Sequence, residues 1–252
     1  MFARYRTQGF IINKINQGLY DRRFIIYTYD FGKLEILAKS ERKINSKLRA
    51  GLELFYLSEI EFIQGKTYKI LTDAVLIESF QNIRNQLDRL EIAFKISEIL
   101  DRFLDLEQKD RKIWNLLSKT FNRLNNLKLL EIKNSLEIKN WQLEIIYYYF
   151  LWNFLAFLGY QPELYYCSIC QNKLVPEKLY FSCADGGIVC NQCLEKINSP
   201  KVEAIDPETV KVLRFILREK WEVVKRLEIK EKNKENLKSI SNYYVSELQS
   251  HF

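Results

Sequence analysis

The amino-acid sequence predicts an α+β protein, in which a small N-terminal β-barrel precedes an α-helical domain that carries an inserted four-cysteine module. Three observations support this fold class. The first 80 residues alternate apolar runs with turn signals, apolar side chains recur at helical spacing beyond about residue 82, and four of the five cysteines form two Cys-x-x-Cys pairs. We expect the barrel at 1–80, the helical domain at 81–163 and 199–252, and the cysteine module at 164–198.

Five β-strands are predicted in the barrel, at 9–13, 22–30, 33–39, 53–63 and 68–78. These segments are rich in Ile, Tyr, Phe and Leu, and turn residues separate them. Asp30-Phe31-Gly32 is short enough for a hairpin, so the second and third strands should pair antiparallel. We expect five antiparallel strands to close into a barrel, because closure removes exposed sheet edges.

Amphipathic helices are predicted in the rest of the chain, at about 87–104, 110–124, 135–158 and 235–248, with a further helix that begins at Pro207. Gly159 is a plausible end for the third of these, with Pro162 beyond it. Asp206 is typical of an N-cap, and proline is favoured at the first helical position.

The two cysteine pairs predict a structural zinc site. Cys167 and Cys170 form the first pair, Cys190 and Cys193 form the second, and 19 residues lie between the two pairs. Two such pairs, each on a tight turn, complete a tetrahedron of four thiolates with no open position, so the zinc should be structural, with one Zn²⁺ per chain. Cys183 lies between the pairs, and we interpret it as a small side chain of the intervening hairpin.

The charge of the chain is concentrated at its N-terminal end. Residues 1–50 hold 11 basic and 4 acidic residues, an excess that equals the formal net charge of +7 for the whole chain. A basic segment on a neutral remainder indicates a surface that faces a polyanion, although a solubilising surface has the same composition.

Basic residues gather where the third strand should leave the barrel, and short polar residues lie between them. With Lys33 from that strand, the candidate DNA-binding residues are Lys33, Lys39, Arg42, Lys43, Lys47 and Arg49. The barrel segments are also rich in aromatic residues, namely Tyr5, Phe10, Tyr20, Phe24, Tyr27, Tyr29 and Phe31. Some of these rings could stack nucleobases, whereas most of them are expected in the core.

Several functional classes are disfavoured by what the sequence lacks. The chain has one histidine, His251, which leaves no Ser/His or Cys/His arrangement for nucleophilic catalysis. Gly65-Lys66-Thr67 has no partner glycine at position 60, so it is not a phosphate-binding loop. The most apolar run, 145–158, is too short to span a bilayer, and no membrane partner is expected. We therefore predict a binding protein of the cytoplasm rather than an enzyme.

These features in this order resemble the bacterial RecO family of recombination mediators over nearly the whole chain. The resemblance rests on the segments Thr7-Gln-Gly-Phe-Ile-Ile12, Asp21 to Lys39, Ser46 to Phe55, Leu71 to Ser79 and, most specifically, Phe181-Ser-Cys-Ala-Asp-Gly-Gly-Ile-Val-Cys190-Asn-Gln-Cys193. Two positions differ from the family. Ser40 stands where a glycine is usual, and Leu19-Tyr20 follow Gly18 where an acidic residue is expected.

The resemblance implies an N-terminal OB-fold, a helical domain and a zinc module inserted between helices, without enzymatic turnover. It also implies binding of single- and double-stranded DNA, annealing of strands coated by single-strand-binding protein, and loading of RecA together with RecR. The acidic, apolar C-terminal tail of single-strand-binding protein would dock in the helical domain, at residues that the sequence does not identify. A nucleoid-associated location follows from this role.

Two other functions remain open at this stage. The first is an interaction adaptor with a structural zinc site and only incidental affinity for DNA. The second is a nuclease that holds Mg²⁺ on clustered carboxylates such as Asp101, Asp105 and Glu107, although a solvated helix face is the commoner role of such residues.

Overall fold

A computed structural model gives the fold of residues 3–127, 136–196, 201–218 and 220–250. The chain divides into two compact units, residues 1–147 and 148–252, which we describe separately. Ser135, where a helix was expected to begin, and residues 197–200, where the cysteine module was expected to end, lie outside the described residues, as does His251.

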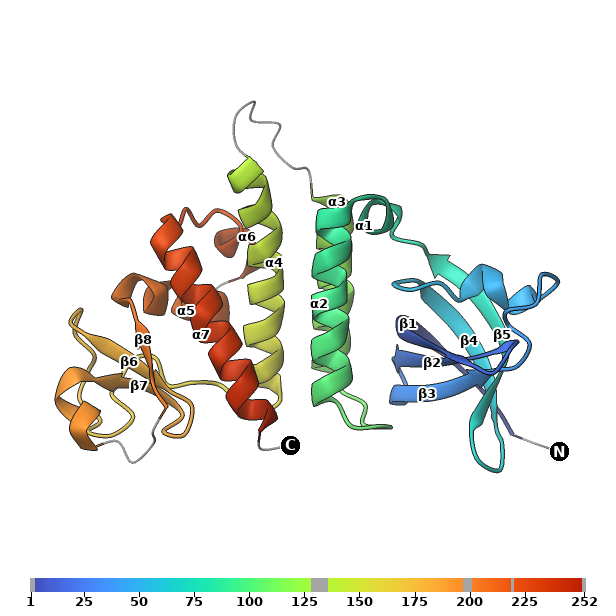
Figure 1. The fold of residues 1–252 in the computed structure, drawn as a ribbon, viewed down its shortest axis with the longest axis horizontal. Helices are drawn as coiled ribbons and strands as arrows, with labels where there is room; N and C mark the ends of the chain where they lie inside the picture. Colours follow the sequence, from blue (N-terminus) through green and yellow to red (C-terminus); the bar gives the residue numbers. More distant parts are fainter. Residues whose placement is uncertain (1–2, 128–135, 197–200, 219, 251–252) are drawn as a thin grey trace. The chain divides into compact units, whose positions relative to one another are not determined.

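Residues 4–78 form a closed five-stranded barrel, as the sequence predicts (Figure 1). The strand order is β1-β2-β3-β5-β4, and a short 3-10 helix, η1 (Lys47–Gly51), precedes β4. The strands are β1 (Arg4–Gln17), β2 (Asp21–Thr28), β3 (Gly32–Ala38), β4 (Leu57–Gln64) and β5 (Lys69–Glu78). One pairing differs from the expected antiparallel pattern. Because β4 pairs with β1, β5 returns beside β3 in the parallel direction, with only two paired positions.

The hairpin at Asp30-Phe31-Gly32 is confirmed. Gly32 adopts φ +70°, and β2 and β3 pair antiparallel on either side of it. The fourth strand, by contrast, begins later than predicted. Phe55 has φ +67°, and its backbone N–H donates to the carbonyl of Ile11 at 2.9 Å, so residues 53–56 form a turn against β1 instead of a strand.

The barrel packs on both its inner and its outer surface. The inner cluster consists of Ile11, Phe24, Ile26, Leu34, Ile36, Ala38, Leu52, Ile60, Phe62, Leu71 and Ala74. On the outer side, Phe10 meets Trp114 and Phe121, with ring centroids 5.1 and 5.3 Å apart. Both of those rings belong to α3 (Arg111–Asn126), which follows α1 (Gln81–Asn85) and α2 (Leu87–Phe103) in the same unit.

The second unit combines helices with a three-stranded sheet of order β7-β6-β8. Its elements are the C-terminal part of α4 (Leu136–Phe157), β6 (Leu179–Ser182), β7 (Gly187–Cys190), the 3-10 helix η2 (Asn191–Lys196), β8 (Glu203–Ile205), α5 (Pro207–Arg218), α6 (Trp221–Val224) and α7 (Glu231–Gln249). The buried Trp152 stacks on Tyr244 at 5.3 Å and donates its indole N–H to Ser241 Oγ at 3.0 Å.

Two predicted helix ends in this unit are confirmed. The carboxylate of Asp206 accepts the backbone N–H of Glu208 at 3.0 Å, so Asp206 caps α5 and Pro207 is its first residue. Gly159 has φ +95° and follows the end of α4. Within the described part of the chain, no helix has the length and apolar character to cross a membrane.

Candidate metal centre and nucleic-acid interface

The first cysteine pair lies on a tight turn after α4. The backbone N–H of Gln171 donates to the carbonyl of Cys167 at 2.9 Å, and the N–H of Cys167 donates to the carbonyl of Asn172 at 2.8 Å. Gln171 completes this turn with φ +60°. The chain therefore reverses within the pair, which brings the sulfur atoms of Cys167 and Cys170 to the same side.

The second cysteine pair follows the β6–β7 hairpin. Cys190 ends β7 and Cys193 lies one turn later in η2. The first turn docks on this hairpin, because the N–H of Ser168 donates to the carbonyl of Ile188 at 2.8 Å. Gly187 allows the close approach, since a Cβ there would lie 2.4 Å from the carbonyl oxygen of Glu163.

The four sulfur atoms of Cys167, Cys170, Cys190 and Cys193 lie within 4.8 Å of one another. A zinc ion bound by four thiolates at about 2.3 Å requires sulfur atoms about 3.8 Å apart, and the Cys170–Cys190 separation is 3.9 Å. Cys167 and Cys193 are buried, whereas Cys170 lies at the surface. The four residues predicted as ligands thus have the donor type and the spacing that a tetrahedral metal site requires.

The sulfur atoms differ in how easily they ionise. Burial raises the pKa of Cys167, but backbone N–H groups of Cys170, Cys190 and Ile169 donate to its sulfur and together lower that pKa to about 6. Burial and the neighbouring sulfurs raise the pKa of Cys193 to about 12. Four thiolates at this spacing repel one another strongly, so a doubly charged cation is what allows all of them to ionise together.

Cys183 does not belong to the four-sulfur group. It follows β6, at the other end of the hairpin from Cys190, and burial raises the pKa of its thiol. The expectation that Cys183 is a side chain of the hairpin rather than a ligand agrees with this position.

The predicted basic residues cluster on the connection between β3 and β4. We define the cationic loop as residues 39–49, with the five cations Lys39, Arg42, Lys43, Lys47 and Arg49. All five side chains are exposed, and among the described residues no carboxylate lies at ion-pair distance from any of them. The only acidic residue of the loop, Glu41, is 1% exposed and is paired with Arg22, so it does not offset the charge at the surface.

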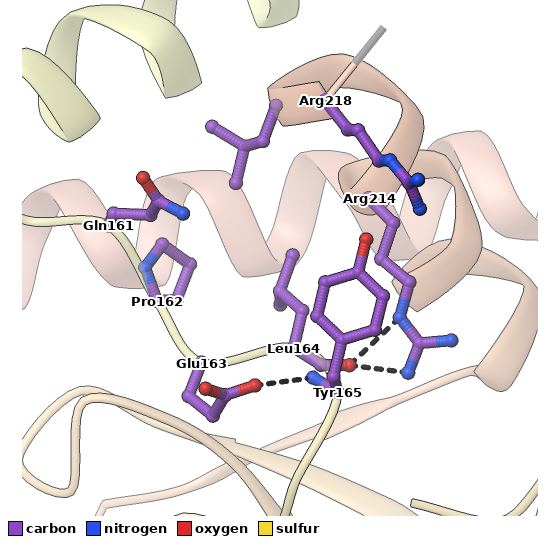
Figure 2. A pocket seen from close by; sticks show the side chains of 8 residues that line it. Gln161, Pro162, Glu163, Leu164, Tyr165, Arg214 and Arg218 are labelled. Carbon is purple, nitrogen blue, oxygen red and sulfur yellow. Dashed lines mark hydrogen bonds between the residues drawn. The ribbon is translucent and has the colours of Figure 1, made fainter.

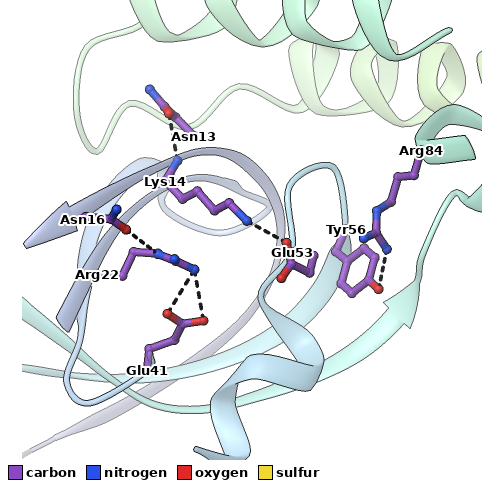
Figure 3. A network of polar contacts seen from close by, with 8 residues as sticks. All are labelled: Asn13, Lys14, Asn16, Arg22, Glu41, Glu53, Tyr56 and Arg84. Atoms are coloured by element: carbon purple, nitrogen blue, oxygen red, sulfur yellow. Dashed lines mark hydrogen bonds and ion pairs between the residues drawn. The ribbon is translucent and has the colours of Figure 1, made fainter. Parts of the chain in front are cut away.

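Figure 3 shows the contacts that hold this end of the barrel. Arg22 lies between Glu41, whose carboxylate oxygens are 3.2 and 3.4 Å from Nη1, and Asn16, whose Oδ1 accepts from Nε at 3.0 Å. Lys14 pairs with Glu53 at 2.7 Å, beyond the far end of the loop. The cationic loop is therefore attached to the barrel by a buried ion pair near its beginning and by a second pair past its end.

Ser40 adopts the backbone conformation that favours glycine. Its φ is +55°, and its backbone N–H donates to Oδ1 of Asp21 at 2.7 Å. The serine therefore keeps the left-handed turn at the strand exit, at a conformational cost of about 1 kcal/mol relative to glycine.

Lys33, which the sequence placed with the cationic residues, has a different role. It is 8% exposed, and its Nζ donates to the backbone carbonyl of Asp101 in α2 at 2.7 Å. The ammonium group thus binds the end of a helix inside this unit, and we omit Lys33 from the proposed interface.

The seven aromatic candidates divide between the core and the surface. Phe10, Phe24 and Tyr27 are buried, and Phe31 packs against the inner cluster. Tyr5 and Tyr29 remain 38% and 39% exposed, and the guanidinium of Arg111 lies 3.4 Å from the ring centroid of Tyr29. Tyr20 is the most exposed of the seven candidates, at 53%.

A pocket of about 430 Å³ lies beside α5 in the second unit (Figure 2). Arg214 forms one wall; its Nε donates to the carbonyl of Leu164 at 2.9 Å, and its guanidinium lies 4.6 Å from the ring centroid of Tyr165. Arg218 extends the basic side of the pocket, while apolar side chains form much of the rest. The lining residues are Gln161, Pro162, Glu163, Leu164, Tyr165, Arg214, Leu217 and Arg218.

Two family models match this chain, and together they cover nearly all of it. The model described as Recombination protein O N terminal matches residues 1–80, and the model described as Recombination protein O C terminal matches residues 84–249. The first match coincides with the barrel, and the second includes the four cysteines and the pocket.

Curated relatives agree with these matches. The DNA repair protein RecO of Dehalococcoides mccartyi strain BAV1 is 34% identical over 89% of this chain and 83% of its own length. Those of Caldanaerobacter subterraneus and Desulforamulus reducens are each 28% identical, over 89% and 96% of this chain and 85% and 88% of their own lengths. This chain therefore belongs to the RecO family of DNA repair proteins.

Proposed function

We propose that this protein binds single- and double-stranded DNA through the cationic loop. The observation that carries the proposal is the set of five exposed cations without a carboxylate partner among the described residues, on a loop whose one acidic side chain is buried. Phosphates of a DNA backbone are the ligands that such a surface attracts most strongly, because each contact releases condensed counterions. A chain that binds DNA in this way acts at the nucleoid, in the cytoplasm.

The proposed activity is that of a recombination mediator without enzymatic turnover. Membership of the RecO family supports a role in DNA repair and recombination. We infer that the protein anneals complementary strands coated by single-strand-binding protein and, with RecR, helps to load RecA. Neutralising the phosphates of two strands on one basic surface lowers the repulsion that opposes their pairing.

The four cysteines are proposed to hold one structural Zn²⁺. The apolar cluster of this module is small, with Val189, Cys167 and Cys193 as its buried members. A module with so little apolar core depends on its metal for stability, and four protein ligands leave no position for a substrate.

The acidic, apolar C-terminal tail of single-strand-binding protein is proposed to dock in the pocket beside α5. Arg214 and Arg218 offer positive charge for carboxylates, and Leu164 and Leu217 offer apolar walls. A peptide that ends in such a tail should bind the wild type, and Arg218→Glu should abolish that binding while the fold is retained. Equal binding by both proteins would refute this location.

The experiment that tests the main function compares the wild type with a variant in which the five cations of the loop are replaced by glutamine. We expect the variant to lose both DNA binding and strand annealing, whereas Lys109→Gln, which removes a charge from an exposed lysine elsewhere, should retain both. Annealing that survives in the five-fold variant would contradict the assignment. Weak, salt-insensitive DNA binding by the wild type would favour the adaptor alternative.

The purified wild-type protein can also be tested for nuclease activity, which a recombination mediator without turnover should lack. Labelled DNA incubated with Mg²⁺ or Mn²⁺ should stay intact. Cleavage that a single change such as Asp101→Asn abolishes would overturn the proposal of a protein without turnover.

A further inference from the structure

Three large apolar side chains are exposed at the end of the barrel from which the cationic loop leaves. Leu19 and Tyr20, in the turn between β1 and β2, are 80% and 53% exposed, and Ile44 in the loop is 90% exposed. We call these three residues the apolar tip. Removing apolar side chains of this size from water is favourable, so their position at the surface suits a contact with another molecule.

The apolar tip and the cations belong to one surface. The backbone N–H of Arg42 donates to the carbonyl of Tyr20 at 3.0 Å, and its guanidinium donates to the carbonyl of Gly18 at 3.3 Å. Nζ of Lys43 lies 5.2 Å from the centroid of the Tyr20 ring. Apolar and cationic groups therefore alternate over two chain segments that hydrogen bonds hold together.

The two acidic residues next to this surface, Glu41 and Asp21, bind groups of the protein itself. Glu41 is buried against Arg22 (Figure 3), and a carboxylate oxygen of Asp21 accepts the N–H of Ser40 at 2.7 Å. The exposed part of the surface thus presents apolar groups and positive charge.

A ligand that matches this surface carries negative charge and apolar faces at short, regular intervals. A single strand of nucleic acid has both properties, because its bases are free to leave the stack and its phosphates follow one another along the backbone. A duplex has the same phosphates but hides its base faces. Charge complementarity and exposed apolar groups together favour the single strand over the duplex.

We propose that Leu19, Tyr20 and Ile44 contact the bases of a single DNA strand, while Arg42 and Lys43 bind the flanking phosphates. This inference rests on the proposed DNA-binding function and adds a site to it. The cations bind any DNA, and the apolar tip supplies the preference for unpaired bases.

The test uses the full chain and three probes, namely an oligothymidine strand, a strand with the same number of phosphates but abasic sugars, and a duplex. The wild type should bind the oligothymidine more tightly than the abasic strand. Tyr20→Ser should weaken oligothymidine binding by about 5-fold or more, the effect expected for one base–aromatic contact. The double change of Leu19→Ser and Ile44→Ser should reduce it further.

Binding of the abasic strand and the duplex should hardly change in these variants, and neither should the dependence of affinity on salt, because no charge is removed. Val75→Ser is the matched control, since Val75 is an exposed apolar residue of the same barrel, at 51%. Thermal unfolding of each variant checks that the fold is kept.

Two results would overturn the inference. If the tip variants distinguish oligothymidine from abasic DNA as well as the wild type does, the bases are bound elsewhere, and the cationic DNA-binding function is unaffected. If the wild type binds none of the three probes, the proposed function and this inference are both wrong.

Discussion

The dependence of DNA affinity on salt concentration gives the most quantitative test of the cationic loop. The perturbation is the replacement of one cation at a time, as Arg42→Gln or Lys43→Gln, in the full chain. Both side chains are exposed and neither has a carboxylate partner among the described residues, so the change removes one charge without breaking an ion pair.

The structure sets the magnitude. Five free cations that each bind one phosphate of a single strand give a slope of about −3.5 for log K against log[salt], since each contact contributes about −0.7. Between roughly 50 and 200 mM salt, the affinity should therefore fall by about two orders of magnitude. Each single replacement should change the slope to about −2.8.

Fluorescence anisotropy of a labelled oligonucleotide, titrated at several salt concentrations, measures these slopes. Lys109→Gln is the matched control. Lys109 lies beside Gly32, since a Cβ on that glycine would be 2.8 Å from the Lys109 backbone nitrogen. Gly32 is the first residue of β3, whereas the cationic loop begins with Lys39 after the last residue of that strand. The control charge is therefore near the opposite end of β3 from the loop. The control should keep the wild-type slope. A slope near zero for the wild type, or the same reduction in Lys109→Gln as in Lys43→Gln, would refute the assignment of phosphate contacts to this loop.

Three further predictions concern the metal and the support of the loop. Cys170→Ser should reduce the zinc content from one equivalent and make the module sensitive to protease, whereas Cys183→Ser should retain the metal; elemental analysis distinguishes them, and zinc-free wild type would contradict the site. Ser40→Gly should stabilise the protein by about 0.5–1 kcal/mol in urea unfolding, because glycine adopts positive φ at lower cost; destabilisation would show that the Ser40 side chain contributes more than its backbone strain. Glu41→Gln should destabilise by about 2 kcal/mol, because Arg22 keeps its charge in a largely buried place; an unchanged midpoint would mean that solvent already screens the pair.

The features that the sequence predicted are those with a local cause. The hairpin at Asp30-Phe31-Gly32 depends on three adjacent residues, and the helix start at Pro207 depends on the preceding aspartate. The four-cysteine group was predictable because each pair shapes its own turn and the donor chemistry admits few alternatives. The family resemblance and these local signals led to the same fold class.

Two of the features that the sequence did not reveal depend on residues far apart in the chain. Lys33 looked like one of a row of cations, but its partner Asp101 is 68 positions away. The fourth strand was predicted to begin too early because Phe55 is apolar enough for a strand, whereas its contact with Ile11 turns the chain there. The short elements α6 and β8 have too few residues to show a period.

The cationic loop also has a consequence for the protein without its ligand. Two unit charges about 10 Å apart in water repel each other by about 0.4 kcal/mol, and five of them on one short segment make several such pairs. The free fold therefore bears an internal Coulomb strain that dissolved ions screen over about 10 Å at 0.1 M. Added salt therefore has opposite effects on the two states. It stabilises the ligand-free protein by screening this repulsion, and it lowers the affinity of the protein for a polyanion.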